Sequence, residues 1–189
     1  MISKKGQMEV VGLVIIVILI TLGMLFMATF ALKSDPQKKI FTRKGLSYST
    51  MSAVMKTTIS GEANCVQQYQ GLENPKIGAD IIDDCAKYPD TGGFSLYRCA
   101  GPISKQPLHS CIFLREMTAF LLNETLGGWN KNYEFRSQLL TFQGSQPEEL
   151  IEPIRVGGGC PKYKDRDASG LFPINTEAGL VENVLYLCD

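Results

Sequence analysis

The sequence is poor in residues that carry out metal or acid-base chemistry. It contains a single histidine, His109, and none of its six cysteines forms a Cys-x-x-Cys pair. A histidine-based metal site, catalytic dyad or triad would therefore have to include His109. Its neighbour Cys111 lies two positions along a helix, where the two side chains do not face each other. We expect no enzyme activity, no metal site and no cofactor, and a helix-capping or solvent-exposed role for His109.

The chain also lacks an excess of charge of either sign, with 19 basic and 19 acidic residues. Residues 1–32 hold Lys4, Lys5 and Glu9, so the remainder carries 17 basic and 18 acidic residues. Nucleic acid is not an expected partner, because its phosphates are bound by strongly basic surfaces. Adjacent acids such as Asp83-Asp84 are expected to lie in solvent.

Charged residues are absent from residues 10–32, a run of 23 mostly apolar residues. As a helix this run would be about 34 Å long, which matches a hydrocarbon core of about 30 Å. A secretory signal peptide has a shorter apolar core and a small-residue cleavage site at its far end, and residues 30–33 offer no such site. We predict a transmembrane helix over residues 7–32, with the membrane as its partner.

The residues directly before this run, Lys4-Lys5-Gly6-Gln7, resemble the class III signal peptide of archaeal type IV pilin-like proteins. The resemblance covers about the first thirty residues. It implies that a prepilin peptidase is a partner and cuts on the cytoplasmic side between Gly6 and Gln7. Lys5, Gly6 and Gln7 would then form the cleavage junction, and residues 1–6 a leader.

The same resemblance suggests a role for Glu9. In that family an acidic residue usually stands five positions into the mature chain, where it can pair with the N-terminal amine of a neighbouring subunit. Glu9 stands at the third position. It either reaches such an amine or lies in the first turn of its own helix, where a carboxylate complements the positive end of the helix dipole. The resemblance implies other pilin-like subunits, or further copies of this chain, as partners.

All six cysteines follow the apolar run, which is typical of disulfides formed in an oxidising space. They are Cys65, Cys85, Cys99, Cys111, Cys160 and Cys188. Six cysteines allow fifteen pairings, and the sequence does not choose among them. Our preference is for neighbours: Cys65 with Cys85, Cys99 with Cys111, and Cys160 with Cys188.

Two signals disagree about the side of the membrane on which the large domain lies. Five basic residues closely follow the apolar run, so a positive-inside count places this domain in the cytoplasm. They are Lys33, Lys38, Lys39, Arg43 and Lys44. The cysteines and the cleavage junction favour the opposite side, and we expect a single-pass cell-membrane protein with a cytoplasmic N-terminus and an extracytoplasmic domain. In that domain, Asn123 begins a candidate glycosylation sequon, Asn-Glu-Thr.

The rest of the sequence predicts a small α+β domain over residues 46–189. A basic linker over residues 33–45 is expected to precede this domain, and Pro36 in the linker should stop or kink the membrane helix. Helical spacing of apolar residues covers 46–59, with Ser47 or Ser49 as a cap, and then 77–88 and 108–126. Strands are predicted over 94–99, 133–142, 149–156 and 179–188. Helices thus come first and antiparallel strands towards the C-terminus. Trp129, Tyr133 and Phe135 are expected in the core.

Two functions are compatible with this organisation. The first is a surface-exposed, pilin-like structural subunit of a type IV pilus-like filament or pseudopilus, whose apolar helices bundle with those of other copies. The second is a membrane-tethered extracytoplasmic binding or assembly-accessory domain that does not polymerise. Lys5-Gly6-Gln7 favours the first, whereas Pro36 and the position of Glu9 favour the second.

Overall fold

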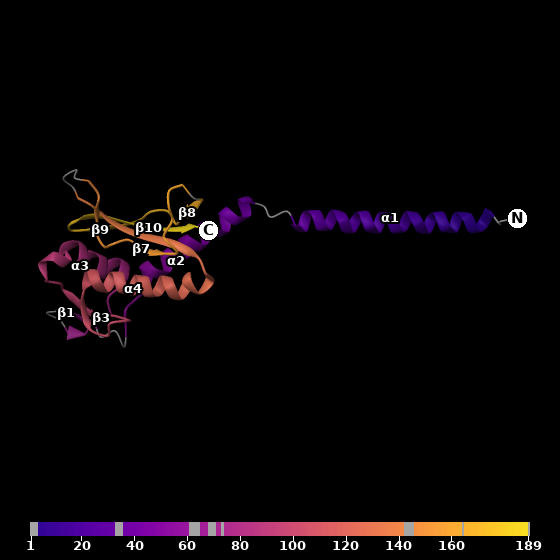
Figure 1. The fold of residues 1–189 in the computed structure, drawn as a ribbon. Helices are drawn as coiled ribbons and strands as arrows, with labels where there is room; N and C mark the ends of the chain where they lie inside the picture. Colours follow the sequence, from indigo (N-terminus) through magenta and orange to yellow (C-terminus); the bar gives the residue numbers. More distant parts are fainter. Residues whose placement is uncertain are drawn as a thin grey trace. The chain divides into compact units, whose positions relative to one another are not determined.

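A computed structural model describes residues 4–32, 36–60, 65–67, 71–72, 74–141, 146–163 and 165–188. The chain divides into two compact units, Met1–Ile40 and Phe41–Asp189. The first contains helix α1 (Lys4–Leu32), and helix α2 (Pro36–Lys56) continues into the second (Figure 1). The second unit is hereafter the C-terminal domain. It holds the strands of the described chain and is an α+β domain, as predicted.

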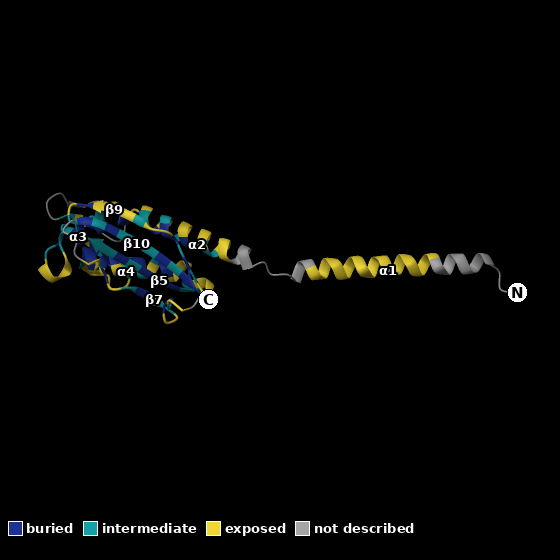
Figure 2. Ribbon diagram, turned by 90° about the horizontal axis from the view of Figure 1, so that it is seen from above, coloured by how far each residue is buried: buried dark blue, intermediate teal, exposed yellow. Residues whose placement is uncertain are grey.

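Helix α1 is apolar around its whole circumference. Every side chain from Gly12 to Thr29 is exposed (yellow in Figure 2). An amphipathic helix would confine its apolar residues to one face, so α1 has no face set apart for packing on a water-soluble core. The helix ends at Leu32, where the uncharged run of the sequence also ends.

Helix α2 occupies most of the segment for which the sequence predicted a basic linker. The linker prediction over residues 33–45 is wrong for residues 36–45, which form the start of α2. Pro36 is the first residue of the helix, where its missing N–H breaks no helical hydrogen bond and its fixed φ suits the first turn. Lysine and arginine are good helix formers, so the basic residues that follow do not prevent the helix.

Ser47 and Ser49, predicted as alternative helix caps, lie inside α2. Their hydroxyls donate to the carbonyl oxygens three residues earlier, Lys44 O and Leu46 O, each at 3.0 Å. The cap prediction is wrong because the helix begins well before them, at Pro36. Interior hydroxyls that bond the preceding turn are the usual alternative to capping.

The larger sheet has six antiparallel strands in the order β6-β5-β10-β8, with β7 also paired to β5 and β9 to β10. The strands are β5 (Asn132–Leu140), β6 (Glu148–Glu149), β7 (Ile154–Val156), β8 (Arg166–Ala168), β9 (Phe172–Thr176) and β10 (Gly179–Cys188). The long central strands β5 and β10 confirm the predictions over 133–142 and 179–188. The strand predicted over 149–156 is instead two short strands, β6 and β7. Pro153, which lies between them, has no backbone N–H to donate to a neighbouring strand.

The smaller sheet has the order β2-β1-β3-β4, and its neighbouring strands are antiparallel. The strands are β1 (Val66–Gln67), β2 (Gly71–Leu72), β3 (Tyr97–Ala100) and β4 (Pro107–His109). The strand predicted over 94–99 overlaps β3. The other strands are too short for an alternating pattern to reveal them.

Helices lie between the two sheets of the C-terminal domain (Figure 1). The π-helix η2 (Ile77–Ile81) continues into α3 (Ile82–Lys87), and α4 (Ser110–Thr125) packs beside α3. These elements confirm the helices predicted over 77–88 and 108–126. Two single turns of 3-10 helix, η3 (Asp90–Gly92) and η4 (Gly127–Trp129), follow α3 and α4 respectively.

The core forms where these helices meet the larger sheet. Phe113 and Leu185 are fully buried, as are Tyr133 and Phe135, which the sequence placed in the core. The same prediction is wrong for Trp129, whose side chain is 63 % exposed. Trp129 lies in η4, the surface turn that joins α4 to β5, and not behind that turn.

Candidate functional site

The residues of the predicted cleavage junction, Lys5, Gly6 and Gln7, lie at the start of α1, followed by Glu9. Their backbone is helical, and the side chains of residues 4–11 lie outside the described part of the chain. The cut between Gly6 and Gln7 and the pairing of Glu9 therefore stay predictions.

Within α1, the span Gly12–Thr29 is long and apolar enough to cross a membrane, with a mean hydropathy of 2.7 over 18 residues. It is the one such span in the described part of the chain. The hydroxyls of Thr21 and Thr29 donate to Ile18 O at 2.9 Å and Phe26 O at 2.8 Å. These polar groups thus have partners within the helix, as a hydrocarbon environment demands. The span suits either a membrane anchor or a signal.

All six cysteines form disulfides, and one of the three predicted pairs is correct. The bonds are Cys65–Cys99, Cys85–Cys111 and Cys160–Cys188. The last confirms the prediction, whereas the pairs Cys65 with Cys85 and Cys99 with Cys111 are wrong. Disulfides persist in oxidising compartments, so these bonds suggest that the C-terminal domain is extracellular.

The two corrected disulfides follow from the packing of elements distant in sequence. Strand β1 pairs with β3, with Val66 opposite Arg98, which brings the adjoining Cys65 and Cys99 together. Helix α3 packs on α4, which places Cys85 against Cys111. Nearness in sequence does not determine these pairs, because the pairing of β1 with β3 and the packing of α3 on α4 interleave along the chain.

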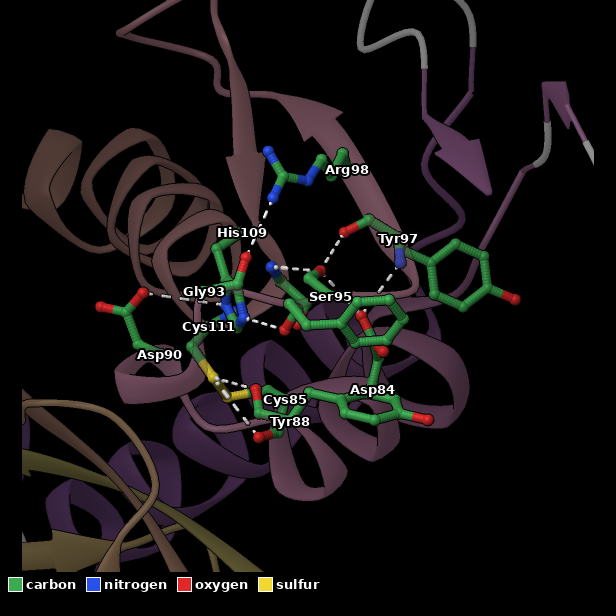
Figure 3. Close-up of polar contacts among 12 residues, drawn as sticks. Asp84, Cys85, Tyr88, Asp90, Gly93, Ser95, Tyr97, Arg98, His109 and Cys111 are labelled. Carbon is green, nitrogen blue, oxygen red and sulfur yellow. Dashed lines mark hydrogen bonds and ion pairs between the residues drawn. A yellow bond between two sulfur atoms is a disulfide. The ribbon is translucent and has the colours of Figure 1, made fainter. Parts of the chain in front are cut away.

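A buried carboxylate, Asp84, joins α3 to β3 (Figure 3). Its Oδ1 accepts the N–H of Leu96 and its Oδ2 that of Tyr97, both at 3.0 Å. The sequence placed the pair Asp83-Asp84 in solvent, which is wrong for Asp84, a residue only 2 % exposed. The signal that could have found it is its position three residues after Ile81, on the buried face of the helix.

His109 is also buried, and both of its ring nitrogens contact backbone groups (Figure 3). Nε2 lies 2.6 Å from Phe94 O, and Nδ1 accepts the N–H of Cys111 at 3.3 Å. Nδ1 is thus the helix-capping acceptor, and Nε2 faces a carbonyl oxygen to which it can donate. The capping role predicted for His109 at the start of α4 is confirmed, and the alternative of solvent exposure is wrong.

The cluster brings together serine, histidine and aspartate side chains without forming a catalytic triad. The hydroxyl of Ser95 bonds to Asp84 Oδ2 at 3.1 Å and to the carbonyl oxygen of Tyr97, and its oxygen accepts the N–H of Ser110 at 3.0 Å. A nucleophilic serine needs a histidine nitrogen to take its proton, whereas the ring nitrogens of His109 contact Phe94 O, the Cys111 N–H and, at 4.0 Å, Asp90 Oδ1, and Ser95 bonds to other groups. The cluster therefore fastens α3, β3 and α4 to one another.

A second buried carboxylate, Glu134, lies on β5. Its Oε1 is 2.6 Å from Arg136 Nη2 and 3.4 Å from Arg155 Nε, and its Oε2 accepts the N–H of Cys160 at 3.1 Å. Burial alone would raise the pKa of this carboxyl, but the Cys160 N–H and the two arginines outweigh burial and lower its pKa. All three glycines of the preceding turn, residues 157–159, have positive φ. Glu134 thus fixes a tight turn beside a disulfide.

The candidate glycosylation residue, Asn123, is exposed near the end of α4. The hydroxyl of Thr125 in the same sequon donates to Leu121 O at 2.7 Å, within the helix. The sequon is thus on the surface and helical, and its glycosylation stays a prediction.

A hollow of about 450 Å³ lies between α2 and α4, beside η4. Its apolar lining residues include Leu46, Val54, Leu121 and Trp129, and its polar ones are Ser49, Thr50, Thr57, Thr125 and the charged Glu124. The hydroxyls of Ser49, Thr57 and Thr125 donate to backbone carbonyls of α2 and α4. A small-molecule site usually combines an apolar surface with several polar groups directed at the ligand, and these three hydroxyls are directed at the backbone instead.

Within the ranges that the structure describes, no group of three or more His, Cys, Asp or Glu residues is placed to hold a metal ion. No family model, curated protein or solved structure matches the chain. The functional inference therefore depends on the residues of this chain alone.

Proposed function

We propose that this protein is a pilin-like structural subunit, anchored in the cell membrane by α1 and exposing its C-terminal domain outside the cell. The observation that carries the proposal is a succession along the chain. Lys5-Gly6-Gln7 stands at the start of α1 and is followed by the long apolar run of the same helix. The C-terminal domain with its three disulfides comes after this run. The resemblance of the N-terminus to archaeal type IV pilin-like proteins implies this order.

The properties of α1 support both anchoring and assembly. The span Gly12–Thr29 contains no charged residue and exposes all of its side chains. A helix that is apolar all round is stable in lipid or in a bundle of similar helices. A cut between Gly6 and Gln7 leaves this helix in place and creates a new amine two residues before Glu9. That amine is a plausible partner for the Glu9 carboxylate of another copy.

The charge at the start of α1 and the disulfides of the C-terminal domain support the proposed orientation. Lys4 and Lys5 precede the apolar run, and short basic segments stay on the cytoplasmic side. The three disulfides lie in the C-terminal domain, where an oxidising space favours their formation. The basic residues at the start of α2 argue for the reverse orientation, and the disulfides carry more weight.

A second candidate function is a tethered domain that does not polymerise. Helix α1 spans Lys4–Leu32 and α2 spans Pro36–Lys56, and residues 33–35 lie outside the described part of the chain. Many pilins have a first helix that runs unbroken into the globular domain. Pro36 close after the apolar run, together with Glu9 at the third position instead of the fifth, favours the second candidate.

A pair of glycine substitutions tests the processing step. Gly6→Val should block cleavage, so that the protein keeps residues 1–6 and migrates more slowly than the processed chain. Gly12→Val is the matched control, because a side chain at Gly12 meets nothing within 4 Å, and it should be processed normally. Terminal peptide analysis of the membrane fraction gives the readout. Equal processing of both variants would contradict recognition of this junction.

Polymerisation separates the two candidate functions. If the protein is a filament subunit, it appears in filaments sheared from the cell surface, and Glu9→Gln reduces its share there without affecting cleavage. Electron microscopy and mass spectrometry of the sheared fraction provide the measurement. A processed chain that stays wholly in the membrane fraction would support the tethered domain.

A further inference from the structure

Three aromatic side chains at one end of the C-terminal domain are strongly exposed. Phe41 is 81 % exposed, Trp129 63 % and Tyr163 86 %. They come from the start of the domain, from η4, and from the loop between β7 and β8. We call this end of the domain the basal surface, defined by Phe41, Trp129 and Tyr163.

Strand register places Trp129 and Tyr163 at the same end of the larger sheet. Cys188, at the end of β10, pairs with Asn132 at the start of β5 and with Arg166 at the start of β8. Trp129 precedes Asn132 by three residues, and Tyr163 precedes Arg166 by three residues. The two aromatic residues therefore approach the sheet at the end where β10 finishes.

An ion pair places the beginning of α2 at this same end. Arg43 Nε lies 2.7 Å from Asp167 Oδ2, and both side chains are nearly buried. Asp167 is next to Arg166 in β8, and Phe41 is two residues before Arg43 on the helix. Figure 1 shows β8 and the C-terminus beside this part of α2. The chain thus enters the domain at the basal surface.

Basic side chains accompany the exposed aromatic ones. The cations of these segments are Lys44, Lys131, Arg155, Lys162 and Arg166, of which Arg155 lies 3.4 Å from Glu134. The exposed acids in or next to the described segments are Glu124 and Asp165, and Asp189, next to Cys188, lies outside the described residues. Trp and Tyr prefer the interface between lipid and water, and lysine and arginine are attracted to anionic headgroups. The composition of the basal surface is therefore complementary to an anionic lipid surface.

The length of the chain limits how far the basal surface lies from the end of α1. Three residues, 33–35, separate Leu32 from Pro36, and four steps of 3.8 Å between Cα atoms reach at most about 15 Å from Leu32 to Pro36. The helical rise from Pro36 to Phe41, the first residue of the basal surface, adds about 8 Å. We propose that the basal surface docks on the headgroup region of a membrane that contains anionic lipid. This inference rests on the membrane anchoring proposed above.

The single tryptophan of the chain is a built-in reporter for this docking. The full-length protein is reconstituted in vesicles of phosphatidylcholine, with or without phosphatidylglycerol, and with or without bromine on the acyl chains. In the anionic vesicles we expect Trp129 emission to shift to shorter wavelength and to be quenched by the brominated chains. Emission typical of exposed tryptophan, with no quenching, would overturn the inference.

Two lysine substitutions on the same helix provide a matched comparison. Lys44→Gln removes a cation at the basal surface, whereas Lys56→Gln removes an exposed cation about 18 Å further along α2. Removing the Lys44 charge should lower the ratio of docked to undocked protein by roughly fivefold, because one cation near an anionic surface contributes about 1 kcal/mol, which is a fivefold ratio. Lys56→Gln should leave quenching unchanged. Equal effects of the two variants would contradict docking at the basal surface.

Two further outcomes are separable in the same experiment. Protein that fails to float with the vesicles would contradict membrane anchoring itself, whereas protein that floats without quenching contradicts only the docking. Emission at short wavelength without quenching would show that protein covers Trp129, such as a second copy seated in the hollow beside it. That result would also overturn docking on lipid.

Discussion

Helices α1 and α2 follow each other in the chain, yet they obtain their stabilisation in different ways. Helix α1 exposes every side chain from Gly12 to Thr29, whereas α2 buries a face that includes Met51 and Val54. Packing of such a face stabilises a helix in water, so α2 depends on the C-terminal domain. Helix α1 has no buried face over Gly12–Thr29, and a helix that is apolar all round is stabilised by lipid or by other helices. Mutations should therefore affect either the domain or the membrane association, and rarely both.

The core substitution Phe135→Ala should give the largest difference between the C-terminal domain and α1. Phe135 is fully buried in β5, and its truncation leaves a cavity that lowers the free energy of unfolding by about 4 kcal/mol. Leu19→Ala, at a position 63 % exposed in α1, should leave domain stability unchanged. Denaturant unfolding of the full chain in detergent, followed by circular dichroism, checks both. Destabilisation of the domain by Leu19→Ala would contradict the claim that α1 and the C-terminal domain are stabilised independently.

The next largest effect should come from Asp84, which is buried among backbone donors. Asp84→Ala removes the acceptor of the Leu96 and Tyr97 N–H groups and should lower the free energy of unfolding by about 3 kcal/mol. Asp83→Ala is the control, since Asp83 is partly exposed and should contribute less than about 0.5 kcal/mol. Urea midpoints of the two variants give the comparison. Similar midpoints would show that Asp84 does not fasten α3 to β3.

A smaller and pH-dependent effect is expected at Glu134. Its pKa is lowered in the folded domain from an ordinary value of 4.5, so its contribution to stability is present at neutral pH. That contribution is lost as the pH falls from about 4.5 through the lowered folded value. Glu134→Gln should cost about 2 kcal/mol at pH 7 and much less under acid conditions.

The control for Glu134 is Glu149→Gln on β6, whose carboxylate is exposed and bonds to Gln138 at 2.9 Å. It should change stability little at either pH. Unfolding curves recorded at pH 7 and near pH 3 test both variants. A loss of stability for Glu134→Gln that stays the same at both pH values would contradict the charged network.

The smallest predicted effect distinguishes a helix from a linker at the start of α2. Gly45 lies inside the helix, and a side chain there meets nothing within 4 Å. Gly45→Ala should raise the free energy of unfolding by about 1 kcal/mol, because alanine loses less conformational entropy in a helix. Gly78→Ala should destabilise instead, since its Cβ would lie 2.6 Å from Met55 O. No gain from Gly45→Ala would favour the linker that the sequence predicts.

Sequence periodicity predicts the long elements of this protein and misses the short ones. The uncharged run of α1, the helical spacing of α4 and the alternation of β10 all extend over enough residues to be recognised. Strands such as β1 and β8 have two or three residues and depend on the neighbours with which they pair. The start of α2 was misread because its many charges resemble those of a linker, although charged residues form helices readily.

The buried polar groups were harder to predict than the fold, because tertiary contacts decide them. Strand alternation puts Glu134 on the face opposite Tyr133 and Phe135, so nothing in the sequence indicates that two arginines and a turn cover it. Two of the three disulfides, Cys65–Cys99 and Cys85–Cys111, interleave along the chain, and only Cys160–Cys188 links cysteines that are neighbours in sequence. Trp129 follows a helix and precedes a core strand, yet its turn leaves it at the surface.

The most direct test of a membrane-anchored, extracellular protein is the intact mass of the chain extracted from its native membrane, measured before and after reduction. We predict a chain that starts at Gln7 and gains six hydrogens on reduction, as three disulfides require. A chain that starts at Met1, whose mass does not change on reduction, would contradict both the processing and the oxidising compartment.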